Sequence, residues 1–209
     1  MRIEFTSQPA REPVLLATVK DALNISFSDK DAFIGTLIAG ARAAVENHTG
    51  LCLITRGANI YLDAWPVENK GSWWSGTREG LVSDVVGLSG ELAFSVRPIQ
   101  SITSIVTIAT DGTETIWDTS NYYLQPGVDA RLHPNVGSSW PTPGRVADGV
   151  RISASVGFGS DWNQVPSDLR AAITKIVAHM YEHRGDDGGA ALIDSGAASL
   201  LNPYRTKRI

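Results

Sequence analysis

The stretch that decides the fold is residues 28–50, SDKDAFIGTLIAGARAAVENHTG, whose apolar spacing is that of one long amphipathic helix. Its apolar residues recur at intervals of three and four, so they form one stripe along a helix surface. Ser28 is the expected N-cap, and Gly50 stands where a left-handed residue ends a helix. The spacing predicts a helix over residues 29–49. Its expected core residues are Phe33, Leu37, Ile38 and Val45.

The apolar stripe needs a partner, and a second helix far downstream has the same spacing. Residues 167–184 follow a Pro166-Ser167 helix start and predict that partner. Two shorter helices are expected over residues 16–24 and 195–201. We therefore predict a small helical bundle. The downstream helix is expected to contribute Leu169, Ile173, Ile176, Val177 and Met180 to its core.

Between the two long helices the apolar period changes to two, which is typical of strands. The strongest signal is a hairpin, in which residues 101–110 and 113–117 flank Asp111-Gly112, a pair suited to a tight turn. Further strands are expected over residues 52–62, 91–96, 122–125, 130–133 and 150–156, and residues 1–13 are expected to be extended.

The predicted fold class is α+β, a helical bundle with an inserted antiparallel β-rich module over about residues 52–157. As domains, we expect a helical core from residues 1–50 and 165–201, a β-rich module from 51–164, and a C-terminal segment from 202–209.

Composition and charge narrow the classes of function. The 209 residues include 18 basic and 22 acidic side chains, which gives a net charge of −4. This charge does not indicate a protein that binds nucleic acid by neutralising its phosphates. No apolar run approaches the roughly 20 residues needed to span a bilayer, so we expect no membrane partner. The single cysteine, Cys52, lies between Leu51 and Leu53 and is expected to be a buried structural thiol.

One string resembles a metal site. His179, Glu182 and His183 form an H-x-x-E-H pattern on a predicted helix, as in one class of zinc hydrolase. A third protein ligand would have to come from Asp186, Asp187 or Asp194, near a glycine-rich break. The competing interpretation is the polar end of an amphipathic helix, where cationic groups are favoured near the C-terminus. We favour the second and expect no enzyme activity, no metal and no cofactor.

Residues Trp73 and Trp74 are adjacent in a glycine-rich loop. Such rings usually pack on the domain's own sheet, but exposed they would anchor a partner protein. Together with Trp140 they support an alternative function, a β module that recognises a carbohydrate or a host surface.

A set of segments in fixed order resembles a known family. The segments DAFIGTLIAGARAAVENHTG, LITR, RPIQSITSI, VPSDLRAAITKIVAHMYEHR and SLLNPYR are similar to the head-to-tail connector (adaptor) proteins of long-tailed double-stranded DNA phages and gene transfer agents. They cover both ends of the chain and part of the middle. Residues 68–90 have no match in that pattern, so the resemblance assigns no role to Trp73 or Trp74.

The resemblance implies a structural, head-completion role. Members of this family form a ring under the portal, join the capsid to the tail and extend the DNA channel. The implied partners are the portal protein, a tail-side connector or stopper protein, and further copies in a ring of twelve. DNA would pass through the lumen without specific binding. The implied location is the head-to-tail interface of a virion or gene transfer agent particle, assembled in the host cytoplasm.

The C-terminal segment is the expected portal-docking element. Pro203 ends the preceding helix, and the residues after it combine one aromatic ring with three positive charges. We expect this segment to become ordered on its partner, so that removing residues 202–209 leaves the melting temperature nearly unchanged. The alternative is a frayed, solvated tail. The expected docking residues are Tyr204, Arg205, Lys207, Arg208 and Ile209.

Overall fold

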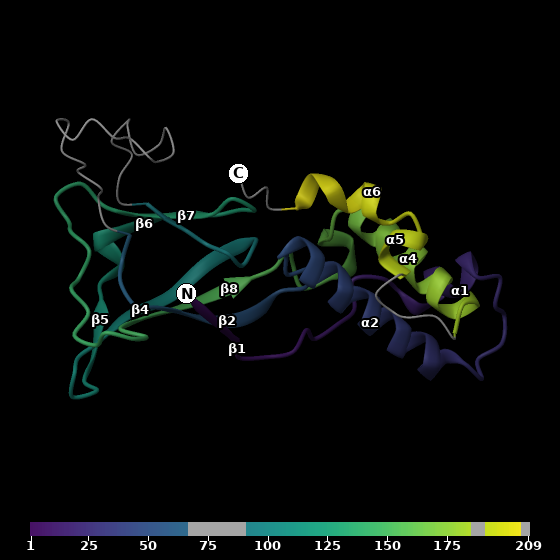
Figure 1. Cartoon of the computed structure of the whole chain (residues 1–209), viewed down its shortest axis with the longest axis horizontal. Helices are drawn as coiled ribbons and strands as arrows, with labels where there is room; N and C mark the ends of the chain where they lie inside the picture. The colour runs from purple at the N-terminus through teal and green to yellow at the C-terminus, as the bar shows by residue number, and fades with distance from the viewer. Residues whose placement is uncertain (67–90, 185–190, 206–209) are drawn as a thin grey trace. The chain divides into compact units, whose positions relative to one another are not determined.

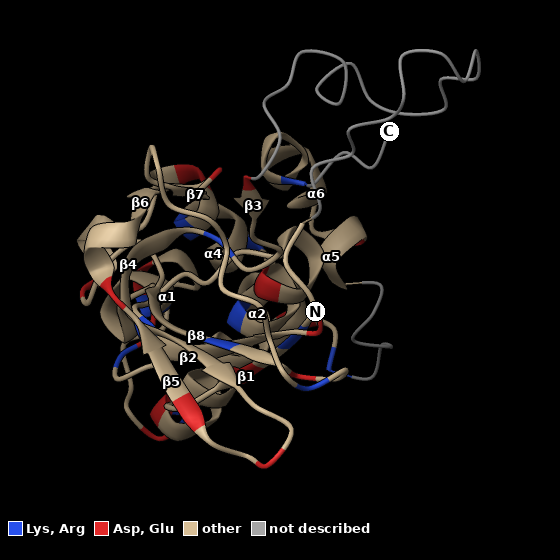
Figure 2. Cartoon of the chain, turned by 90° about the vertical axis from the view of Figure 1, so that its left-hand side faces the viewer, with Lys and Arg blue, Asp and Glu red and all other residues tan. Residues whose placement is uncertain are grey.

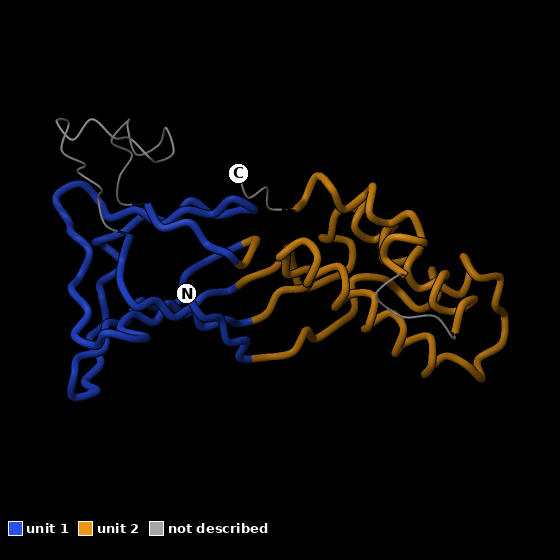
Figure 3. The backbone as a smooth tube through the Cα atoms, viewed as in Figure 1, with its two compact units in different colours: residues 1–6, 57–95, 99–155 blue, residues 7–56, 96–98, 156–209 orange. Residues whose placement is uncertain are grey.

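The chain forms two compact units (Figures 1 and 3). The computed structural model describes residues 1–66, 91–184 and 191–205. Unit 1 comprises residues 1–6, 57–95 and 99–155, and unit 2 comprises residues 7–56, 96–98 and 156–209. Unit 2 holds the helices and unit 1 holds antiparallel sheets, which confirms the predicted α+β class.

Two long helices pack against each other at the centre of unit 2. They are α2 (Asp31–Thr49) and α4 (Ser167–Glu182). The shorter helices α1 (Leu16–Ala22), α5 (Ala191–Asp194) and α6 (Ala198–Leu201) pack on α4. Burial of the facing apolar stripes supplies most of the stability of such helices. The buried side chains are Ile34, Ile38, Ala41 and Val45 from α2, and Leu169, Ala172, Ile173, Ile176 and Val177 from α4.

Three residues expected in the helix core lie at its margin instead. Leu37 and Met180 are only half-buried. Phe33 is 41% exposed, so its assignment to the core is wrong. It lies in the first turn of α2, where its ring contacts Tyr181 near the end of α4, with 6.3 Å between ring centroids. At the ends of two packed helices, one face of each side chain meets solvent.

The sequence predicted the C-terminal end of α2 correctly and its N-terminal end incorrectly. Gly50 has a φ of 70° and caps the C-terminus, its N–H donating to the Glu46 carbonyl. Ser28 is not the N-cap. The helix begins at Asp31 with Lys30 as its N-cap, and the Ser28 carbonyl instead accepts from the Asp31 N–H in the preceding turn.

The chain leaves α2 through a buried connection. Residues 51–54 are buried, and isolated bridges join Leu51 to Arg97 and Ile54 to Gly159. The strand predicted over 52–62 therefore starts only at Arg56. These bridges place residues 51–56, 96–98 and 156–164 with the helices, so the unit boundaries differ from the predicted domain boundaries at 51 and 164. The domain assignment itself stays a prediction.

A buried carboxylate fixes this connection. Glu46 is 9% exposed and accepts hydrogen bonds from the Leu53 N–H at 2.9 Å, from Arg42 at 3.1 Å and from Arg56 at 3.0 Å. Arg42 also donates to Glu12 at 2.9 Å. Three donors satisfy the carboxylate, as burial of a charge requires.

Unit 1 is built from two antiparallel sheets. The larger follows the order β1-β2-β8-β4-β5 and the smaller follows β3-β7-β6. The strands of the larger sheet are β1 (Arg2–Phe5), β2 (Arg56–Leu62), β8 (Val150–Val156), β4 (Ile99–Ile108) and β5 (Glu114–Trp117). Those of the smaller are β3 (Leu92–Ala93), β7 (Arg131–Pro134) and β6 (Tyr122–Gln125).

The predicted hairpin is confirmed. Strands β4 and β5 pair antiparallel from Ile105 opposite Trp117 to Ile108 opposite Glu114. Gly112 has a φ of 88°, as the tight turn requires. The Thr113 N–H donates to the Asp111 carboxylate at 2.9 Å and lowers the pKa of that side chain. Burial alternates strictly along β8, as its sequence predicted.

Blue bands (Lys and Arg) and red bands (Asp and Glu) both occur on the strands of unit 1 (Figure 2). Arg151 on β8 donates two hydrogen bonds to Glu114 on β5, at 2.8 and 2.6 Å. Arg2 donates to Asp148 at 2.8 Å and lies over the Tyr61 ring at 4.0 Å. Among the helices that the structure describes, none combines the length and apolar character of a membrane span.

The first prediction concerns Glu46. Replacing it by Gln removes the negative charge that Arg42 and Arg56 share. Breaking a buried ion pair from one side is strongly destabilising, so E46Q should lower the free energy of unfolding by about 3 kcal/mol. Urea unfolding followed by circular dichroism measures this. The matched control, E182Q, changes an exposed glutamate and should stay within about 0.5 kcal/mol of wild type. Equal stability of E46Q and E182Q would show that the buried carboxylate does not hold the connection.

Candidate interaction surfaces

Tyr204, near the start of the C-terminal segment, makes hydrogen bonds within the helical unit. Tyr204, in the short 3-10 helix η3 (Asn202–Tyr204), donates its hydroxyl to the Asp168 carboxylate at 2.7 Å. Its carbonyl accepts from Arg97 at 2.9 Å, and Arg97 also donates to the Thr49 carbonyl at 3.0 Å. Burial and the hydrogen bond to Asp168 raise the pKa of Tyr204 to about 12. Tyr204 therefore belongs to the packed helical unit.

This contact changes the predicted docking segment. Tyr204 is not the free aromatic anchor that its sequence context indicated, and removal of residues 202–209 would break both of its contacts. Arg205 is exposed. Lys207, Arg208 and Ile209 lie outside the described residues. Docking by the residues after Tyr204 stays a prediction.

The histidines of the H-x-x-E-H string stack on each other. The rings of His179 and His183 lie 4.4 Å apart between centroids at 18°. His183 is the C-cap of α4, and its Nδ1 lies 3.2 Å from the His179 carbonyl. In the described part of the chain, no three His, Cys, Asp or Glu side chains come together to hold a metal, and Asp194 is the one proposed third ligand described there. This geometry fits the polar end of a helix.

Aromatic and cationic side chains form a patch near the end of α4 that sequence analysis did not predict. Its residues are Phe27, Lys30, Phe33, Tyr181 and Arg184. Arg184 lies 4.6 Å from the ring centroid of Tyr181 and 5.4 Å from that of Phe33. Lys30 lies 5.7 Å from Tyr181 and 5.9 Å from the Phe27 ring. Phe27 and Phe33 are 47% and 41% exposed. The sequence did contain one signal for this patch. Phe33 lies at the start of one long predicted helix and Tyr181 lies near the end of the other, and the two helices were expected to pack against each other.

The tryptophans considered for sugar binding divide into two groups. Trp73 and Trp74 lie outside the described residues. Trp140 stacks on the buried Trp65 at 4.2 Å, with an interplanar angle of 17°, and lies 5.4 Å from Trp117. One face of Trp140 is therefore covered by the protein's own core, which suits packing in unit 1 better than stacking on a sugar.

Cys52 is the buried thiol that its neighbours predicted. It is 2% exposed, and Arg56 donates to its sulfur at 3.4 Å. Burial raises the pKa of the thiol, although the nearby guanidinium opposes that effect. A protonated, buried thiol is a poor nucleophile.

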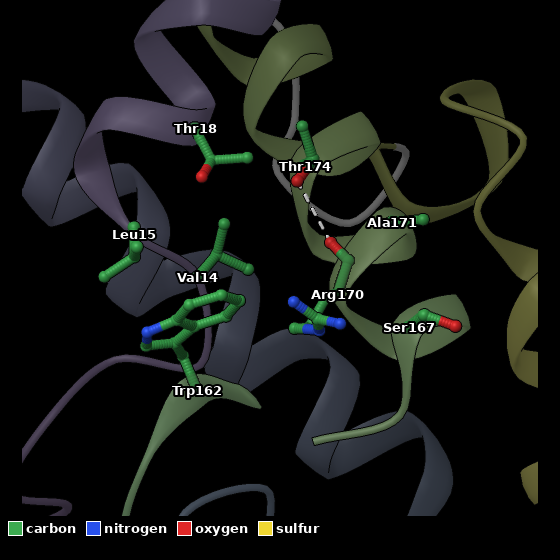
Figure 4. Close-up of a pocket in the computed structure, with 8 residues that line it drawn as sticks. All are labelled: Val14, Leu15, Thr18, Trp162, Ser167, Arg170, Ala171 and Thr174. Carbon is green, nitrogen blue, oxygen red and sulfur yellow. Dashed lines mark hydrogen bonds between the residues drawn. The ribbon is translucent and has the colours of Figure 1, made fainter. Parts of the chain in front are cut away.

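A pocket of about 240 Å³ opens in unit 2 beside α4 (Figure 4). Arg170 of α4 lies over the Trp162 ring of η2 (Trp162–Gln164), 5.0 Å from its centroid. Thr174 donates its hydroxyl to the Arg170 carbonyl at 3.0 Å. The hollow thus combines a cation, an aromatic face, hydroxyl groups and apolar walls. Its lining residues are Val14, Leu15, Thr18, Trp162, Ser167, Arg170, Ala171 and Thr174.

The second prediction tests the Tyr204 contact. Y204F removes one hydrogen bond to a carboxylate, so at pH 8 it should lower the free energy of unfolding by about 1–2 kcal/mol. The folded protein holds the Tyr204 proton more tightly than the unfolded chain does, because its pKa is raised to about 12. This contribution is therefore complete below pH 10 and is lost as the pH rises towards 12. Urea unfolding at pH 8 and pH 11.5 measures the loss. Y123F, at a 60% exposed tyrosine, is the control, and a Y204F effect no larger than the control's would contradict the contact.

The third prediction concerns His179 and His183. The double variant H179A/H183A should assemble as the wild type does, because both rings belong to the polar end of α4. Wild-type protein purified without chelator should contain far less than one zinc per chain by elemental mass spectrometry. Zinc at unit stoichiometry that the double variant loses would overturn this interpretation.

Solved structures of other proteins share the fold of this chain. No protein-family model matches the chain, and a search of curated proteins finds no match. Solved structures do match. A chain in the neck of an empty gene transfer agent particle, computed with C6 symmetry, has a TM-score of 0.73 at 23% identity, covering 100% of this chain and 97% of that one. A chain in the virion of a native gene transfer agent particle has a TM-score of 0.73 at 24% identity, with the same coverage.

A third match is a chain in the neck of a native gene transfer agent particle, computed with C12 symmetry. Its TM-score is 0.66 at 22% identity, again covering 100% of this chain and 97% of that one. At these identities the likeness concerns the fold. Over its whole length the chain therefore has the fold of proteins found in gene transfer agent particles, which confirms at the level of the fold the resemblance to connector proteins seen in its sequence.

Proposed function

We propose that the chain is a structural, non-enzymatic subunit of the neck of a tailed phage or gene transfer agent particle, at the head-to-tail interface. The observation that carries this proposal is the match over 100% of the chain and 97% of the matched neck chain. A match over one unit alone would be compatible with a shared module in an unrelated protein. Here the match includes both the helical unit and the sheets.

The proposed assembly is a ring of twelve copies under the portal. The matched necks were computed with C6 and C12 symmetry, and twelve subunits are compatible with both. Closure of a ring requires heterologous contacts, in which one face of each copy meets a different face of the next. Such a ring would complete the head and extend the DNA channel.

The proposed partners follow from the position of the ring. The portal protein would contact it on the head side, and a tail-side connector or stopper protein on the other. DNA would pass through the lumen without specific binding, since a net charge of −4 gives the chain no overall attraction for phosphates.

We propose that residues 205–209 dock on the portal. Arg205 is exposed, and Lys207 and Arg208 add two further positive charges to the same short segment. Tyr204 ties the start of this segment to α4 through Asp168. A docking segment anchored at one end has less conformational freedom to lose on binding than a tail that is free from residue 202 onward.

The fourth prediction separates docking from folding. Deleting residues 206–209 keeps both contacts of Tyr204, so the melting temperature should stay within about 1 °C of wild type, while attachment to portal-bearing heads falls at least tenfold. Deleting residues 202–209 also removes the Tyr204 contacts and should lower the melting temperature by several degrees. Electron microscopy of heads mixed with each purified protein counts attached rings. Full attachment by the shorter deletion would place portal docking elsewhere on the chain.

A further inference from the structure

The pocket beside α4 contains a cation whose natural partner is missing from the chain's own described residues. No ion pair to Arg170 is found within residues 1–66, 91–184 and 191–205, and its Nε is buried without a hydrogen-bond partner there. Two other cations of the helical unit have acidic partners close by. Lys20 pairs with Asp31 at 2.7 Å, and Arg56 pairs with Glu46 at 3.0 Å.

The surroundings of Arg170 increase its affinity for an anion. The Arg170 guanidinium lies 5.0 Å from the centroid of the Trp162 ring, and a contact with an aromatic face does not use the N–H donors of the guanidinium. The side chains of Val14 and Leu15 form an apolar wall, which lowers the local dielectric and strengthens a charge interaction. Ser167 and Thr18 add hydroxyl groups. A carboxylate on a short side chain, with its apolar stem against Leu15, fits this combination.

The same chain carries free carboxylates that could fill the pocket of another copy. Within the described residues, four exposed carboxylates of the helical unit form no ion pair: Asp21, Asp29, Glu182 and Asp194. In a ring, the surface bearing the pocket meets a different surface of the next copy, so a cation on one and a carboxylate on the other can pair at every interface.

We infer that the Arg170 pocket receives an acidic side chain of a second copy of this chain and so helps to close the ring. This inference rests on the ring proposed above. The contact is a desolvated, charge-assisted hydrogen bond repeated once per subunit, and its aromatic and apolar walls exclude water from it.

Three variants test the pocket. R170Q removes the charge, A171R fills the hollow from an exposed position, and K175E alters an exposed lysine on the same helix outside the pocket. Sedimentation velocity over a concentration series, at low and high salt, measures ring formation by the full chain. We expect R170Q and A171R to raise the concentration needed for rings at least about thirtyfold, and K175E to leave it within threefold.

The melting temperature distinguishes this role from a structural one. Because Arg170 has no acidic partner within its own described fold, R170Q should melt at or above the wild-type temperature while its rings weaken. A purely structural arginine would show the reverse. Wild-type rings matched by equally stable R170Q and A171R rings would overturn the pocket assignment alone. A wild type that stays monomeric at every concentration would overturn the proposed ring and with it this contact.

Photo-cross-linking identifies the occupant. Benzophenone-alanine is placed at the exposed pocket residue Thr18, and rings are formed from an equal mixture of ¹⁴N and ¹⁵N chains. We expect cross-linked peptides of mixed isotope that contain one of the free carboxylates. Cross-links confined to single-isotope pairs, or a pocket that cross-links to added duplex DNA in preference to a second copy, would contradict the inference.

Discussion

The helical unit depends on one buried carboxylate. Glu46 lies near the end of α2, where it accepts from the Leu53 N–H and from two guanidinium groups. It thereby ties the residues after α2 back to the helix, in the same stretch that forms the bridges from Leu51 to Arg97 and from Ile54 to Gly159. A buried charge is tolerated when it is paired and hydrogen-bonded, and an alternative path of the chain would leave this carboxylate without the Leu53 N–H. Three segments distant in the sequence are brought together in this way.

The helices and the hairpin could be predicted from the periodicity of the sequence. The residues at which these elements begin, and how far their contacts extend, could not. Spacing of 3.6 identified α2 and α4, and Asp111-Gly112 identified the β4–β5 hairpin, because each signal is local. Periodicity shows which helix face is apolar but not how far the partner extends along it, so Phe33 was assigned to the core although it is 41% exposed. An alternating run likewise cannot distinguish a strand from a buried connection, which is why the strand expected from residue 52 begins at Arg56.

The interaction surfaces were harder to predict because they depend on tertiary contacts. Composition indicated a loose, cationic C-terminal segment, yet Tyr204 bonds to Asp168, 36 residues earlier in the chain. Local sequence contains no signal for a pair so far apart. The pocket could not be predicted for the same reason. Trp162 and Arg170 come together only because a 3-10 turn and the start of a helix place one over the other. Charged residues therefore need to be sorted by whether the fold pairs them, and only then do the unpaired ones indicate where another molecule binds.

The burial of Cys52 has a practical consequence. It is the single cysteine among 209 residues and is 2% exposed, with burial raising the pKa of its thiol. Thiol-directed dyes react with accessible thiolates, so we expect the folded wild-type chain to react very slowly with maleimides at neutral pH. A cysteine introduced at any exposed site would then carry the only label on each chain. Energy transfer between labelled copies could report subunit spacing and exchange without first replacing Cys52, a substitution that would disturb the packing around Glu46 and Arg56.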